Sequence, residues 1–103
     1  MEFKDCFNEL KKDFVNKDVR NIPNVVFEFN IKDIGVFYAK VQDGKLDIQP
    51  YNYYDNDVSF TAKFETYKKI INGKLDPIKA FFNGRLKVSG DLGKAAILQN
   101  ILK

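Results

Sequence analysis

The stretch Asn72–Asp91, NGKLDPIKAFFNGRLKVSGD, decides the fold because turn residues divide it into short elements. Asn72-Gly73 and Asn83-Gly84 each read as the end of a helix, since glycine just past a helix adopts left-handed backbone geometry easily. Asp76-Pro77 reads as a helix start, with an aspartate cap followed by proline at the first helical position. The stretch therefore predicts a helix end, a short helix over 77–83, a strand over 85–89 and a further helix from residue 91.

The glycines of this stretch do not form a phosphate loop of the G-x-x-x-x-G-K-S/T type. Gly73 would need a partner glycine at position 68, where Lys68 stands. Gly93 would need one at position 88, where Val88 stands. The glycines therefore separate structural elements.

Upstream of this stretch, apolar and polar residues alternate with the period of two that is typical of strands. Asp43-Gly44 supplies the residues of a tight hairpin turn, and Pro50 places the third strand at a sheet edge, because proline cannot donate to a ladder. The predicted strands span 25–32, 35–42, 45–51, 58–64 and 85–89.

Helical spacing of apolar residues predicts helices over 2–16, 65–72, 77–83 and 91–103. Strands with one apolar face need a cover, which helices supply. We therefore expect an α+β fold, in which about four helices cover one face of a five-stranded, mostly antiparallel sheet. A length of 103 residues fits a single domain over 1–103.

The composition argues against catalysis. The chain has no histidine and one cysteine, Cys6, so a histidine-based triad or a cysteine-histidine metal cluster cannot be built. We expect no enzyme activity, no metal and no cofactor. The start of the chain lacks a signal-like apolar run, and the longest apolar run, Ala95–Leu98, is too short to span a bilayer. These features predict a cytoplasmic protein.

The polar face of the predicted sheet offers a nucleic-acid platform as one reading. Its cations are interrupted by acidic residues, so a solvated face is favoured and no nucleic acid is expected. The residues concerned are Lys32, Lys40, Lys45, Lys63, Arg85 and Lys87 with Tyr38 and Tyr51, among Glu28, Asp47 and Asp57.

Aromatic and apolar residues leave two readings open. Ten phenylalanines and five tyrosines form either an ordinary core or the wall of an apolar cavity. The last predicted helix, 91–103, is apolar beyond a single stripe, which indicates a second apolar surface. That surface either closes a ligand cavity or meets a partner protein.

Two segments resemble the sterol carrier protein 2 family: VSFTAKFETYKKIINGKLDP at 58–77 and IKAFFNGRLKVSGD at 78–91. The hairpin VFYAKVQDGKLDI at 36–48 is similar to that family in a more generic way. The resemblance covers roughly 24–103 and is specific within 58–91. It implies helices on one side of a five-stranded sheet, enclosing an apolar tunnel that binds or transfers a fatty acid, fatty acyl-CoA, phospholipid or sterol-like lipid without catalysis.

The motif positions that match the family are scaffold positions, so the ligand site is inferred from the apolar face. We expect an apolar lipid as partner, movement of the last helix as the gate, and transient contact with a membrane surface. The oligomeric state stays open. The alternative is a protein-interaction module of the same fold with a closed cavity, acting through the last helix. The predicted ligand-binding residues are Phe29, Phe37, Phe60, Phe64, Ile70, Phe82, Leu98, Ile101 and Leu102.

Overall fold

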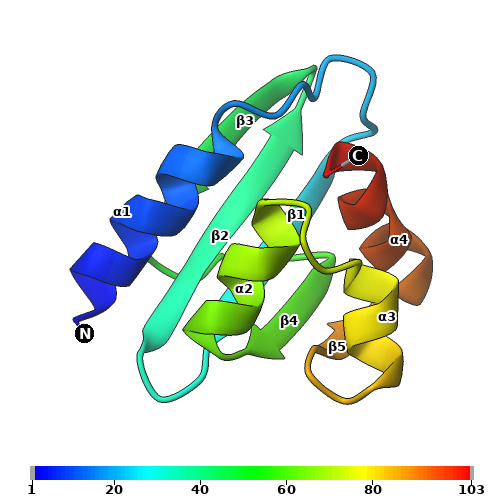
Figure 1. The fold of residues 1–103 in the computed structure, drawn as a ribbon. Coiled ribbons are helices and arrows are strands. Elements are labelled where there is room, and N and C mark those ends of the chain that lie inside the picture. Colours follow the sequence, from blue (N-terminus) through cyan, green and yellow to red (C-terminus); the bar gives the residue numbers. More distant parts are fainter. Residues whose placement is uncertain (1, 103) are drawn as a thin grey trace.

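The computed structural model describes residues 2–102 and forms a five-stranded sheet with four helices in that range (Figure 1). The α+β class expected from the sequence is confirmed. In chain order the elements are α1 (Phe3–Phe14), β1 (Val25–Ile31), β2 (Gly35–Gln42), β3 (Lys45–Gln49), β4 (Val58–Ala62), α2 (Phe64–Ile71), α3 (Pro77–Phe82), β5 (Lys87–Gly90) and α4 (Leu92–Ile101).

The sheet has the strand order β3-β2-β1-β4-β5. Three of its neighbouring pairs are antiparallel, whereas β1 and β4 run parallel, with Phe29 opposite Phe60. The sheet is therefore mixed and mostly antiparallel, as expected, and β3 lies at an edge, where Pro50 ends it. The parallel pair arises because the chain crosses back from the β3 edge before it enters β4.

Helices α1 and α2 lie across one face of the sheet (Figure 1). Beneath them the inward residues of the strands form an aromatic core, in which the ring of Phe29 stacks on Phe37 at 4.9 Å and on Phe60 at 5.3 Å. The buried Tyr67 hydroxyl on α2 donates to the Asn30 carbonyl at 2.9 Å, which satisfies the one polar atom of that ring.

The opposite face is less exposed than the alternation of its residues predicted. The ring of Tyr38 is buried, and the rings of Tyr51 and Tyr53 lie 5.6 and 4.9 Å from it. Burial, with Asp47 nearby, raises the pKa of Tyr38 to about 12. Tyr38 is therefore covered by the segment that follows β3 and does not offer a free stacking face.

Local signals explain most element boundaries. Asp43 and Gly44 adopt φ of 54° and 77°, the positive angles that a two-residue hairpin turn requires. The fifth strand begins at Lys87 and not at residue 85, because the amides of Arg85 and Leu86 donate to the Ala80 carbonyl and close the end of α3.

The last helix ends at Ile101, and the predicted position 103 lies outside the described residues. None of the helices in residues 2–102 has the length and apolar character needed to cross a membrane.

Candidate functional site

An open apolar groove lies between α3, α4 and the β4–β5 side of the sheet. Its volume is about 220 Å³. Side chains from both strands and both helices line it, and Gln99 is the one with a polar end. The lining residues are Phe60, Pro77, Ile78, Phe81, Phe82, Leu86, Val88, Leu92, Ala95, Ala96 and Gln99. We call this set the apolar groove.

Helix α3 exposes large apolar side chains along the groove. Asp76 caps it, accepting from the Ile78 amide at 2.7 Å, and Pro77 begins it. Ala80 alone turns fully into the core, so Phe81 and Phe82 stay outside with 40% and 80% of their surface exposed. Their two rings lie 5.5 Å apart. Rings left in water this way form a favourable surface for an apolar partner or ligand.

Helix α4 has two apolar surfaces, as its composition predicted. Leu98 and Ile101 are buried in the core, whereas Ala95 and Ala96 line the groove. Leu92 also lines the groove and keeps 60% of its surface exposed. The second surface is therefore a wall of the groove.

Asp57 fixes the position of α4. Its carboxylate accepts from the Val26 amide at 2.8 Å and from the Lys94 ammonium at 2.9 Å, and its carbonyl accepts from the Asp91 amide. Burial opposes ionisation of Asp57, but the hydrogen bonds from Lys94 and Val26 outweigh it and hold the pKa of this carboxyl below its ordinary value. The start of α4 is thereby tied to the central strands.

A second hollow of about 280 Å³ adjoins the apolar groove. The two hollows share Pro77 and Gln99 in their linings. Gln99 donates its side-chain amide to Asp76 at 3.1 Å, which ties α4 to the cap of α3 at the shared wall. The other residues of the second hollow are Ile70, Gly73, Leu75, Asp76 and Leu102.

The predicted ligand-binding residues fall into three places. Phe60 and Phe82 line the apolar groove, and Ile70 and Leu102 line the second hollow. Phe64 is half-buried against the core. The remaining four, Phe29, Phe37, Leu98 and Ile101, are buried core residues that line neither hollow.

The groove residues absent from that prediction come mainly from α3 and α4: Ile78, Phe81, Leu92, Ala95 and Ala96. The local pattern of α3 gave no signal of this exposure. Ile78, Phe81 and Phe82 stand at positions i, i+3 and i+4, the spacing of a single apolar stripe, which predicts burial. The groove opens to solvent where Phe82 and Leu92 are exposed. The enclosed tunnel expected from the sequence therefore stays a prediction.

Groups with catalytic potential are absent from the groove. Cys6 lies in the core beneath α1, where burial raises the pKa of its thiol. Within residues 2–102 there is no cluster of three or more side chains that could hold a metal ion. The apolar lining of the groove suits binding of a ligand through burial of its apolar surface.

A five-stranded sheet, a helical cover and an apolar groove define a small α+β domain with an apolar candidate binding site. The chain matches the SCP-2 sterol transfer family over residues 7–103 and belongs to that family, whose members bind and transfer lipids.

Two relatives and one solved structure illustrate the similarity. Sterol carrier protein 2 of Homo sapiens is 28% identical over 102 residues, covering 92% of this chain and 19% of that protein. Peroxisomal multifunctional enzyme type 2 of Mus musculus is 36% identical over 94 residues, covering 86% and 13%. The chain thus spans a fifth or less of these relatives. The solution structure of palmitated SCP2L2 from Aedes aegypti has a TM-score of 0.70 at 22% identity, covering 99% and 95%, and shares the fold.

Proposed function

We propose that this protein binds an apolar lipid, without catalysis, by taking its acyl or other apolar chain into the apolar groove. The observation that carries the proposal is the exposure of large apolar side chains at the groove. Ile78, Phe81, Leu92 and Phe82 keep 39%, 40%, 60% and 80% of their surfaces in water. Burying such surfaces is favourable by about 25 cal/mol per Å².

The size of the groove indicates how a long chain is accommodated. At about 220 Å³ it is smaller than an ordinary small-molecule pocket, which begins near roughly 300 Å³. The second hollow of about 280 Å³ shares a wall with it at Gln99 and Pro77. A short chain therefore fits the groove alone, and a long chain extends into the second hollow when Gln99 turns aside.

The proposed energetics are those of transfer from water. Each methylene that enters the groove gains about 0.8 kcal/mol, so affinity rises with chain length until the hollows are filled. The family membership supports this reading, and the palmitated state of the Aedes aegypti structure suggests palmitate as a probe.

Displacement of a fluorescent fatty acid by palmitate tests the proposal. We expect the double variant Phe82→Ser with Leu92→Ser to bind the probe about tenfold or more weakly, because two groove walls are lost. Its stability should change little, since both side chains are largely exposed. Tyr54→Ser is the matched control, because Tyr54 is 96% exposed and lies outside the groove.

The same samples distinguish the alternative, a protein-interaction module. A wild-type protein that ignores the fatty-acid probe but dimerises in native mass spectrometry, with the dimer lost in the double variant, would replace lipid binding by self-association. Unchanged probe affinity in a folded double variant would also exclude the groove as the lipid site.

A further inference from the structure

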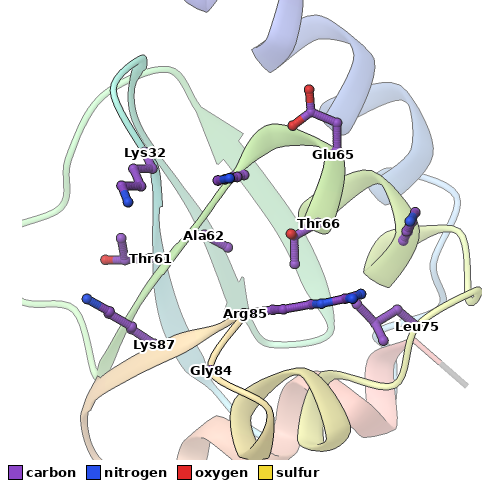
Figure 2. A pocket seen from close by; sticks show the side chains of 11 residues that line it. Lys32, Thr61, Ala62, Glu65, Thr66, Leu75, Gly84, Arg85 and Lys87 are labelled. Atoms are coloured by element: carbon purple, nitrogen blue, oxygen red, sulfur yellow. The ribbon is translucent and has the colours of Figure 1, made fainter.

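Apart from the two apolar hollows, a chemically different pocket lies between α2, the α3–β5 turn and the ends of β1 and β4. Its volume is about 480 Å³. Figure 2 shows Arg85 reaching between the helices toward Leu75, with Lys32, Thr61 and Lys87 gathered on the sheet side. We call it the basic pocket; its lining residues are Lys32, Thr61, Ala62, Lys63, Glu65, Thr66, Lys69, Leu75, Gly84, Arg85 and Lys87.

The basic pocket concentrates the positive charge of the protein. Five cationic side chains and one carboxylate, Glu65, give its lining a net charge of +4. The whole chain carries +3, so the remaining residues together are close to −1. The mild overall basicity is thus the property of one concave corner and not of the surface in general.

The cations of the basic pocket have no carboxylate partners within residues 2–102, since none of the five forms an ion pair there. The contrast with the neighbouring Lys68 is informative, because Lys68 turns to α1 and meets Asp13 at 2.9 Å and Glu9 at 3.4 Å. Lys69, the next residue, faces the pocket and meets no carboxylate. Like charges gathered without counterions raise the local potential and attract an anion.

Further donors reinforce this attraction. Thr61 and Thr66 contribute half-buried hydroxyls to the lining. Helix α2 begins here after Lys63, which makes no side-chain cap hydrogen bond, so the positive end of the helix adds to the field of the cations. Arg85 supplies a planar guanidinium suited to two oxygens of one phosphate.

We propose that the basic pocket binds a ligand that presents one or two phosphate groups. Phosphate oxygens match the number of donors, and two linked phosphates match both the charge and the volume better than a lone carboxylate would. This goes beyond the binding of an apolar chain, and it does not depend on the groove. Leu75 lines both the basic pocket and the second hollow, so the two sites are neighbours.

Inorganic pyrophosphate is the probe for the pocket itself, measured by calorimetry and by thermal unfolding at low salt. We expect binding to the wild-type protein that weakens as salt screens the charges. The double variant Lys69→Gln with Arg85→Gln should bind about tenfold or more weakly, because two charge-assisted contacts are lost. Both side chains are exposed, so the variant is expected to fold.

Lys12→Gln with Lys45→Gln is the matched control, because it removes the same charge from α1 and β3, outside the pocket. It should bind pyrophosphate like the wild type. An equal loss in this control would show that net charge alone attracts the anion and would overturn the site.

A second arm identifies the source of the phosphate. Phosphatidylcholine vesicles with and without phosphatidic acid are sedimented with each protein. If the protein sediments with phosphatidic-acid vesicles and only the pocket variant loses this, the ligand is a lipid headgroup. If the protein binds pyrophosphate but does not sediment with these vesicles, the ligand is a soluble phosphate compound. Failure of both probes to bind the wild-type protein at low salt refutes the proposal, and fatty-acid binding is unaffected by that result.

Discussion

Gln99 on α4 donates its side-chain amide to the Asp76 carboxylate that caps α3, over a distance of 3.1 Å. The other carboxylate oxygen of Asp76 accepts from the Ile78 amide. Because Gln99 lines both apolar hollows, this hydrogen bond holds their shared wall in place. If the groove binds a lipid as proposed, this bond links the geometry of the helix pair to the length of the chain that fits.

Gln99→Leu should test this link. We expect the free energy of unfolding to fall by about 1 kcal/mol, because one side-chain hydrogen bond is lost. We also expect a greater preference for long over short fatty acids, because the shared wall becomes apolar. Urea unfolding and displacement assays with decanoate and palmitate measure the two effects.

Gln49→Leu is the control for that variant. Gln49 also donates to a carboxylate, that of Asp47 at 2.7 Å, but it lies on β3 and outside both hollows. It should leave chain-length preference unchanged. If both variants change the chain-length preference equally, the Asp76–Gln99 hydrogen bond does not determine that preference.

Gly90 permits close contact between β5 and the chain entering β4. It adopts φ of +104°, and a Cβ there would lie 2.7 Å from the Asp57 carbonyl oxygen. We expect Gly90→Ala to lower the free energy of unfolding by about 2 kcal/mol or more, from backbone strain and the contact with Asp57. Gly73→Ala, with φ of +76° and no atom within 4 Å of the added Cβ, should cost only about 1 kcal/mol in urea unfolding. Equal losses would argue against the steric account.

Acid should weaken the attachment of α4. The folded-state pKa of Asp57 lies below its ordinary value of 3.8, so its contribution to stability is complete above that pH. The contribution is lost as pH falls below 3.8 through the folded pKa. Thermal unfolding between about pH 5 and pH 2.5 should show a steeper decline for the wild type than for Asp57→Asn. Parallel curves would show that the Lys94 and Val26 hydrogen bonds leave this carboxyl unshifted.

The thiol of Cys6 should be unreactive in the folded protein. Its side chain is fully buried on α1, and burial raises its pKa, so thiolate is scarce at neutral pH. Ellman's reagent should react with it slowly in native buffer and promptly in urea. Rapid reaction without denaturant would indicate that α1 opens readily from the sheet.

The fold was largely predictable because its boundaries depend on local chemistry. Asp76-Pro77 and Asp43-Gly44 act through caps and backbone angles that a few neighbouring residues determine. The period-two pattern over 25–32 likewise predicted the strand that the structure shows as β1 (Val25–Ile31).

The groove was less predictable, because it depends on how two helices cross. Phe29 and Leu98 look as suitable for a ligand wall as Phe60 does. Yet Phe14 of α1 and Tyr67 of α2 pack against Phe29, and Leu98 is buried in the core. Phe81 and Phe82 illustrate the same limit. Ala80 takes the core-facing position of α3 and both rings stay exposed, and no local pattern carries that information.

Every residue of the apolar groove falls between Phe60 and Gln99, within one uninterrupted tract of the chain. The hairpins of β1, β2 and β3 contribute nothing to its lining. Natural variation in this tract alone is therefore able to reshape the proposed binding site while the rest of the scaffold is inherited unchanged. A grafted tract from a homologue should bring its own ligand preference with it.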